Sequence, residues 1–261
     1  MRFCVLGSGS KGNSTFIESG ETRILIDSGF SGKETARRLA EVNVDIALLS
    51  GIIVTHEHTD HVKGVSILSR RYKLPVFATA ATFAAAMDLK SSHACHEISP
   101  GTAFSLENLV IHPFAISHDA ADPVGFVVSN NLFSLGYCTD TGVVSRLMQH
   151  RLSSCHGLIL ECNHDPEMLK TGPYPEMLKQ RVRSKVGHLA NAEAVNFLRE
   201  LLHENMQYVV LAHISETNNH PEKVQQTLAE IINTDNGPDP RISLAHQDRP
   251  GKMFILKGSP G

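Results

Sequence analysis

The sequence of 261 residues contains no tryptophan, few aromatic residues (6%) and no Cys-x-x-Cys pair. Its five cysteines are irregularly spaced, which argues against a disulfide framework or a zinc ribbon and favours a reducing compartment, the cytoplasm. No apolar run approaches the roughly 20 residues that a membrane helix needs, and the N-terminal stretch lacks the apolar core of a signal peptide. We therefore expect no membrane partner. A net charge of −3 excludes nucleic-acid binding through bulk charge, but it allows a local basic patch.

The composition, with 41% hydrophobic and 20% charged residues, is that of a globular protein, and the length suits a single domain over residues 1–261. Segments with helical periodicity lie at 33–42, 61–72, 80–89, 143–151, 191–203 and 221–232. Apolar runs of strand length lie between them and dominate the middle third, and a polar loop covers 233–241. The pattern suits two sheets packed face to face with helices outside, although periodicity alone does not exclude other α/β layouts.

One short string, His56-Glu-His58-Thr-Asp60-His61, places four potential metal ligands within six residues at the end of an apolar strand. On an extended segment, residues two apart point the same way, so His56 and His58 converge on one ion. The turn into the next helix brings Asp60 and His61 together for a second ion. Imidazole and carboxylate ligands without a thiolate suit zinc, manganese or iron(II) rather than a structural zinc site. The alternative is a polar turn with surface histidines. Four potential ligands so close together argue against it.

The string resembles the signature of the metallo-β-lactamase superfamily, whose fold is a four-layer αββα sandwich around a dinuclear metal site. The resemblance implies three more ligands, each following an apolar strand: His118, Asp140 and His213. It assigns one ion to His56, His58 and His118, the other to Asp60, His61 and His213, and the bridging position to Asp140. The cofactors implied are two divalent ions, zinc or manganese, with iron as a further candidate.

Four further strings are similar to those of the phosphodiesterase branch of this superfamily, which includes tRNase Z, the PhnP-type phosphodiesterases and, with the closest match, the YycJ/WalJ (VicX) group. They are Gly187-His188-Leu-Ala-Asn191, Glu161-Cys-Asn-His164-Asp165, the Gly/Ser loop over 7–13, and His213-Ile-Ser215-Glu-Thr-Asn218-Asn219. The resemblance implies an exonuclease acting 5′-to-3′ on DNA in preference to RNA, through attack by a hydroxide bound to the metal ions. His188 is then the proton donor, and Asp60 and His164 are the other candidate catalytic residues. The alternatives are a helix-cap role for His188 and a structural role for His164.

Candidate substrate contacts fall in three places. The Gly/Ser loop offers backbone N–H groups and the side chains of Ser8, Ser10 and Asn13 to a phosphate, unless it is only a flexible turn. A basic run before His188 carries Arg181, Arg183 and Lys185, which suit a polyanionic backbone or a solvated helix face. The last place is Asn218, shortly after the final candidate ligand.

Two other functions stay open on the sequence. One is a small-molecule hydrolase for a cyclic phosphodiester or a thioester, and the other is a non-enzymatic metal-binding regulatory domain. The strings around His188 and His164 favour phosphoryl chemistry over thioester chemistry, and the complete ligand set argues against a site that has decayed. The sequence does not distinguish a monomer from a homodimer.

Overall fold

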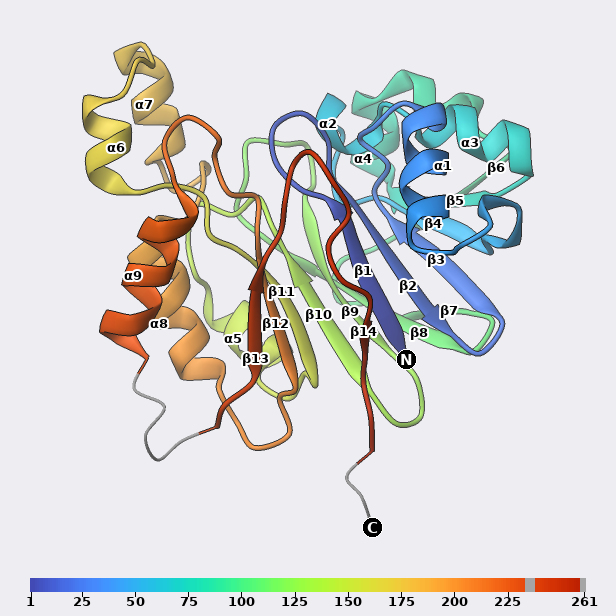
Figure 1. The fold of residues 1–261 in the computed structure, drawn as a ribbon. Helices are drawn as coiled ribbons and strands as arrows, with labels where there is room; N and C mark the ends of the chain where they lie inside the picture. The colour runs from blue at the N-terminus through green and yellow to red at the C-terminus, as the bar shows by residue number, and fades with distance from the viewer. Residues whose placement is uncertain (233–237, 259–261) are drawn as a thin grey trace.

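The computed structural model describes residues 1–232 and 238–258, which form two seven-stranded sheets packed face to face (Figure 1). Sheet A, in the order β14-β1-β2-β3-β4-β5-β6, contains β1 (Arg2–Gly7), β2 (Ser14–Ser19), β3 (Thr22–Ile26), β4 (Gly51–Ile53), β5 (Pro75–Thr79), β6 (Ala94–Ile98) and β14 (Phe254–Ile255). Sheet B, in the order β13-β12-β11-β10-β9-β8-β7, contains β7 (Phe104–Leu106), β8 (Leu109–Ala115), β9 (Val124–Ser129), β10 (Ser134–Cys138), β11 (Gly157–Glu161), β12 (Tyr208–Ala212) and β13 (Arg241–Leu244).

Helices cover the outer faces of both sheets, and a separate pair of helices stands above one end of the sandwich (Figure 1). Beside sheet A lie α1 (Gly32–Glu41), the 3-10 helix η1 (Ile46–Leu48), α2 (Thr59–Val62), α3 (Val65–Tyr72), α4 (Ala80–Ala85) and the 3-10 helix η2 (Met87–Ser91). Beside sheet B lie α5 (Arg146–Leu152), α8 (Asn191–Leu201) and α9 (Pro221–Ile231), and the pair at the end is α6 (Pro166–Thr171) and α7 (Glu176–Val182). In the described part of the chain, no helix has the length and apolar character needed to span a membrane.

Three separate apolar cores fill the spaces between four layers. On β3, Ile24 and Ile26 point into the core between the sheets, where they belong to the same cluster as Phe126 of β9. Leu25 lies between them in sequence and points to the opposite face, into the core under α1 and α3. The third core joins the outer face of sheet B to α5, α8 and α9, with Phe197 of α8 at its centre. The αββα sandwich expected from the sequence is therefore confirmed.

The strand pairing brings the site residues to one edge of the sandwich. Strands β3 to β6 run parallel in sheet A, and strands β10 to β13 run parallel in sheet B. Cys138 of β10 pairs with Leu160 of β11, and Glu161 pairs with Ala212 of β12. Because the carboxyl ends of parallel strands share an edge, the segments that begin at Asp140 and His213 start beside each other.

The structure differs from the predicted elements where local packing overrides periodicity. The helix expected over 61–72 is divided into α2 and α3 because the chain passes Phe30 at Gly64, where a Cβ would lie 2.3 Å from the Phe30 carbonyl oxygen. The helix expected over 80–89 ends at Ala85 and continues as η2. Strand β6 was not predicted because its middle residues are exposed and carry no apolar alternation. Of the loop expected over 233–241, residues 233–237 lie outside the described part.

Candidate metal centre

Three histidines from two loops converge at the edge of the sandwich. His56 and His58 follow β4, and His118 follows β8. One ring nitrogen of each lies within 4.8 Å of one ring nitrogen of each of the others, so the three nitrogens are spaced to surround one ion. The ring centroids of His58 and His118 are 5.0 Å apart, and so are those of His56 and His118. The structure thus brings together the three residues predicted for the first ion.

The residues predicted for the second ion lie against this group. His61 Nε2 is 3.4 Å from Asp140 Oδ2, and His213 Nδ1 is 2.8 Å from Asp140 Oδ1. Asp140 therefore touches both imidazoles with different oxygens. With His56 and His61 it forms a second group of ligand atoms within 4.8 Å of one another. Asp60 is further out, with its Oδ2 3.6 Å from His61 Nε2.

Neighbouring groups fix the orientation of three buried imidazoles, those of His61, His56 and His118. Asp27 Oδ2 lies 2.8 Å from His61 Nδ1, so Nε2 of that ring faces Asp140. Thr55 Oγ1 lies 2.9 Å from His56 Nδ1, and the carbonyl oxygen of Gly187 lies 3.2 Å from His118 Nδ1. Outer partners of this kind hold the ring and the tautomer of histidines that bind metal ions.

Strained backbone accompanies these side chains. Asp140, His213 and Asp27 have φ values of 60°, 53° and 59°, in the left-handed region that residues other than glycine seldom adopt. Such conformations persist only where the surrounding structure imposes them, and they cluster at functional sites. Here they turn the chain sharply after β10, β12 and β3, so that each side chain points toward the same cluster.

The electrostatics of the cluster favour a cation. Burial would raise the pKa of Asp140, but the facing imidazoles of His213 and His61 lower that pKa well below its usual range. Burial would lower the pKa of His61, but the carboxylates of Asp140 and Asp27 raise it to about 10. At His56, burial and then the charge of His61 lower the pKa well below the usual value, so this ring is neutral and its nitrogen can act as a ligand.

Two buried polar atoms of the cluster show that divalent ions fit it. Within the described residues, His56 Nε2 and Asp140 Oδ2 are shielded from solvent and have no hydrogen-bond partner. Buried groups of this kind are rare in native proteins and call for an explanation such as an ion. A donor set of imidazole and carboxylate without thiolate suits a divalent metal ion in a catalytic site.

A histidine–carboxylate pair lies next to the candidate ligands. His188 Nδ1 is 2.7 Å from Glu161 Oε1 and 3.8 Å from Asp140 Oδ1. Glu161 is fully buried, and its other oxygen accepts hydrogen bonds from the backbone N–H groups of Thr141 and Leu189, each at 3.1 Å. Burial would lower the pKa of His188, but Glu161 and then Asp140 raise it to about 9.

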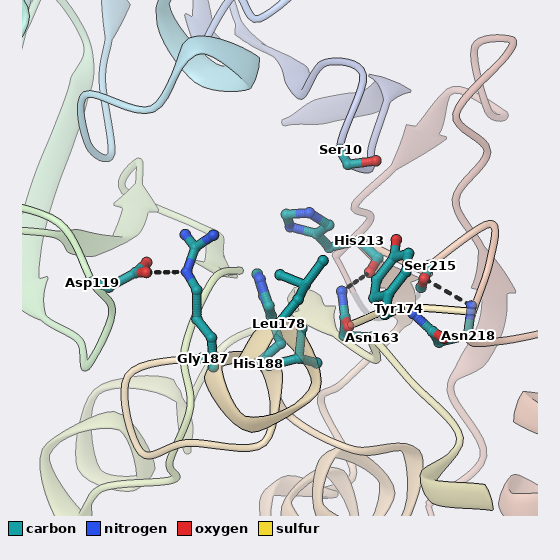
Figure 2. Close-up of a pocket in the computed structure, with 12 residues that line it drawn as sticks. Ser10, Asp119, Asn163, Tyr174, Leu178, Gly187, His188, His213, Ser215 and Asn218 are labelled. Atoms are coloured by element: carbon teal, nitrogen blue, oxygen red, sulfur yellow. Dashed lines mark hydrogen bonds and ion pairs between the residues drawn. The ribbon is translucent and has the colours of Figure 1, made fainter. Parts of the chain in front are cut away.

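A cavity of about 160 Å³ opens beside this pair, between the metal cluster and α7 (Figure 2). We call it the α7 cavity. Its lining combines the imidazoles of His188 and His213 with residues from the Gly/Ser loop, the α6–α7 turn, α7 and the loops that follow β8, β11 and β12. They are Ser10, Asp119, Asn163, Tyr174, Leu178, Arg181, Val182, Gly187, His188, His213, Ser215 and Asn218.

The predicted substrate contacts are distributed between this cavity and other places. Ser10 and Asn218 line it. Ser8 and Asn13 lie behind it, where Ser8 Oγ accepts a hydrogen bond from the N–H of His213 and donates one to Asn13 Oδ1, both at 2.9 Å. The Nδ2 of Asn13 lies 3.0 Å from His61 Nε2. Both side chains are buried and thus support the ligand loops.

The three basic residues predicted to contact the substrate, Arg181, Arg183 and Lys185, also lie in two different places. Arg181 lines the α7 cavity and forms an ion pair with Asp119, whose backbone carbonyl oxygen lies 3.2 Å from His58 Nε2. Arg183 and Lys185 line a second cavity of about 540 Å³ beside α8.

His164 is buried and lies outside the lining of the α7 cavity, and among the described residues its Nδ1 has no hydrogen-bond partner. Burial, and then the charges of His188 and Arg183, lower its pKa to about 4, despite the opposing effect of nearby carboxylates.

Sequence reasoning missed three acidic residues of the site. Glu161 was noted only as part of a string, and no role was predicted for Asp27 or Asp119. The available signal was position, since Asp27 directly follows β3 and Glu161 ends β11. Asp119 follows a candidate ligand, His118, and its carboxylate reaches both that histidine (3.4 Å) and Arg181.

Comparisons with known proteins show which family the chain resembles. The family model described as "Beta-lactamase superfamily domain" matches residues 22–214. The chain is 35% identical to the exodeoxyribonuclease YycJ of Bacillus anthracis, with 89% of each chain covered, and 34% identical to the exodeoxyribonuclease WalJ of Streptococcus pneumoniae, with 88% of each covered. The crystal structure of the metallo-β-lactamase fold protein YhfI from Bacillus subtilis matches with a TM-score of 0.74 at 15% identity, over 97% of this chain and 99% of that one.

Proposed function

The chain belongs to the metallo-β-lactamase superfamily and is a metal-dependent hydrolase of its YycJ group, and from this premise we propose that it is a DNA exonuclease with two divalent metal ions. The observation that carries the proposal is the pair of His188 and Glu161 beside the candidate ligands, in which His188 lines the same cavity as His213. Cleavage of a phosphodiester needs a proton for the leaving alkoxide, and this pair is placed to supply one.

In this proposal, the ligands come from both sheets. His56, His58 and His118 would hold one ion, and Asp60, His61 and His213 would hold the other, with Asp140 shared between them. Bound there, the ions would neutralise charge on the phosphoryl oxygens and lower the pKa of a water nucleophile. Because sheet A supplies His56 and His61 while sheet B supplies Asp140 and His213, we propose that residues 1–261 work as one domain.

His188 acts as the general acid. Glu161 accepts a hydrogen bond from Nδ1–H, which leaves the Nε2–H of the imidazolium for the departing oxygen of the substrate. Against the effect of burial, the charge of Glu161 and its hydrogen bond raise the pKa of His188 and so favour the protonated ring, and a positioned acid contributes about 10²–10⁴-fold to the rate. Asp60 is assigned to the metal site, where its Oδ2 faces His61. His164, a buried residue whose pKa is lowered by burial and also by the charge of His188, is assigned as a positioning residue for that ring.

The finer assignments follow from chemistry and from the relatives. Both curated relatives are named exodeoxyribonucleases, which supports DNA over RNA as the substrate, and we propose the 5′-to-3′ direction for the digestion. Zinc and manganese suit the donor set best, and iron(II) is compatible with it. Since DNA is the substrate and all five cysteines are free, we place the activity in the cytoplasm.

The experiment that tests the proposal compares duplexes labelled at the 5′ end or at the 3′ end. Each is incubated with the manganese-loaded protein and with an Asp140→Ala variant as control, and an RNA duplex of the same sequence runs in parallel. We expect the wild type alone to release labelled mononucleotide at once from the 5′-labelled DNA. Early release from the 3′ label would reverse the direction. Intact DNA beside cleaved RNA or a cleaved cyclic phosphodiester would refute DNA as the substrate.

A further inference from the structure

The α7 cavity has two unlike walls. One wall is apolar and aromatic, and is formed by Tyr174 in the α6–α7 turn and by Leu178 and Val182 of α7. The other wall carries amides and a hydroxyl, from Asn163, Ser215 and Asn218. Figure 2 shows Leu178 beside the imidazole of His188, and Tyr174 among the side chains of Asn163, Ser215 and Asn218. A ligand that fills this space meets both apolar and hydrogen-bonding side chains.

The polar wall is held rigidly by hydrogen bonds. Asn218 is 1% exposed, its N–H donates to Ser215 Oγ at 3.0 Å, and its carbonyl oxygen accepts from the N–H of Asp165 at 2.9 Å. Its side-chain oxygen Oδ1 is buried and has no hydrogen-bond partner among the described residues. Asn163 is fixed as well, since its Nδ2 donates to the carbonyl oxygen of His213 at 2.9 Å.

The turn that carries Tyr174 is packed closely against this wall. A Cβ at Gly172 would lie 2.7 Å from Asn218 Oδ1 and 2.6 Å from the carbonyl oxygen of Met168, so only glycine fits between α6 and the segment around Asn218. Lys179 of α7 is buried and donates from Nζ to the carbonyl oxygen of Lys170 at 2.7 Å, which ties α7 to the end of α6. These contacts fix the backbone on either side of Tyr174.

The size of the cavity limits what it can hold. Sites for drug-sized ligands enclose roughly 300–1,000 Å³, whereas this one has about 160 Å³ and is therefore suited to a single ring system rather than to a whole nucleotide. We propose that the α7 cavity binds the terminal nucleobase of the strand that is being digested, unstacked from the duplex and packed against Tyr174 and Leu178. The inference rests on the proposed nuclease function and names the part of the substrate that this subsite recognises.

The aromatic side chain explains how such a subsite accepts any sequence. Every base has a π face, so stacking on an aromatic side chain is tolerant of sequence. Because the cavity holds one base beside His188, the scissile bond lies one nucleotide from the end of the strand. Mononucleotides are the expected product.

The test combines a variant with a modified substrate. Initial kcat/KM is measured for the wild-type holoenzyme and for Tyr174→Ala, on a duplex with normal ends and on the same duplex with an abasic residue at the terminal position. Stacking on a protein aromatic gives an expected loss of about 5- to 150-fold for Tyr174→Ala on the normal duplex. The wild type should lose a similar factor on the abasic end, and the variant should lose little more there, because the contact is already absent.

Three controls make the result specific. Tyr174→Phe keeps the ring and should stay close to the wild type, which also shows that the position tolerates substitution. Tyr72→Ala removes a half-buried tyrosine on α3 and should leave kcat/KM on the normal duplex unchanged. An abasic residue moved to the third position should leave the full effect of Tyr174→Ala in place.

The outcomes separate the two proposals. Suppose that the wild type digests DNA, and that Tyr174→Ala on the abasic duplex loses the product of the two separate losses. That result would overturn the terminal-base subsite and leave the nuclease function standing. The same holds if Tyr174→Ala has no effect. A wild type that leaves DNA intact would overturn the proposed function, and the subsite with it.

Discussion

Removing the acid at His188 should slow DNA cleavage far more than cleavage of an ester with a good leaving group. The imidazole lies beside the candidate ligands, and Glu161 holds its Nδ1 at 2.7 Å. For His188→Ala we expect kcat on DNA to fall by about 10²–10⁴-fold, the usual contribution of a positioned general acid. Glu161→Gln should have a smaller effect in the same direction, about 10–100-fold, which is typical for loss of an orienting partner.

The expected loss for Glu161→Gln follows from its hydrogen bonds. One carboxylate oxygen serves His188, and the other accepts from the N–H groups of Thr141 and Leu189. A glutamine has a single acceptor oxygen, so it can satisfy only one of these two sets. If its NH₂ group faces the imidazolium, His188 loses its acceptor; if the NH₂ group faces the two backbone N–H groups, those two donors lose theirs. In both cases the imidazolium of His188 loses the negative charge that stabilises it.

The assay compares duplex DNA with bis(p-nitrophenyl) phosphate at saturating substrate. The nitrophenolate leaves without a proton, so both variants should retain most of their activity on this ester while they lose activity on DNA. Metal content per chain is measured for every sample, and the wild-type value is expected in both variants. Equal losses on the two substrates would refute the role of His188 as an acid, and loss of a metal ion in His188→Ala would make it a ligand instead.

Three further predictions address the supports of the site, the substrate path and the fold. Asp27→Asn removes the charge that orients His61, so metal affinity should fall about 10- to 100-fold with little change in the circular dichroism spectrum. Replacing Arg183 and Lys185 with glutamine should lower the slope of log K against log salt for duplex DNA by about 0.9 for each lost phosphate contact. Burial would raise the pKa of Glu18, but its hydrogen bonds with two arginines lower it. The stability from this residue is therefore present above the unfolded pKa of about 4.3 and is lost as the pH falls through the lower folded value, so Glu18→Gln should cost about 1–2 kcal/mol at pH 7 and much less at low pH.

The first two of these predictions have a control within the chain, and the third is checked by its dependence on pH. Asp45→Asn removes a surface carboxylate at the start of η1 and should leave metal affinity unchanged; an equal loss there would remove the specific role of Asp27. Arg37→Gln on α1 removes an exposed charge away from the site. If it lowers the slope of log K against log salt as much as the Arg183 and Lys185 variants do, DNA binding depends on the net charge of the protein and not on these two residues. If the difference in unfolding free energy between wild type and Glu18→Gln does not vary with pH, the pKa of Glu18 is not lowered.

The fold and the core of the site were predictable because their signals are local. The apolar runs of β3, β10, β11 and β12 are buried on both faces, and their sequences predict strands. The string from His56 to His61 places four candidate ligands within six consecutive residues. The resemblance to a known family then supplied His118, Asp140 and His213, which no local pattern would have connected. The structure brings these residues together at one edge.

The supporting residues were not predictable, because their roles depend on strand register. Glu161 reaches His188 and lies close to His213 (3.8 Å) only because β10, β11 and β12 are parallel and in a register that aligns their ends. Asp27 reaches His61 because β3 pairs with β4 so that Ile26 lies beside Ile53. Tyr174 belongs to a turn between two short helices, without periodicity or motif, and only the three-dimensional structure places it at the α7 cavity.

The most direct test of the account measures exonuclease rate against the number of metal ions bound per chain. Metal-free protein is titrated with manganese, bound metal is counted, and release of mononucleotide from 5′-labelled duplex DNA is followed at each point. The account predicts no release without metal and a maximal rate when two ions are bound per chain, with Asp140→Ala inactive throughout. Digestion by the metal-free protein, or a maximal rate with a single ion, would contradict a dinuclear nuclease site.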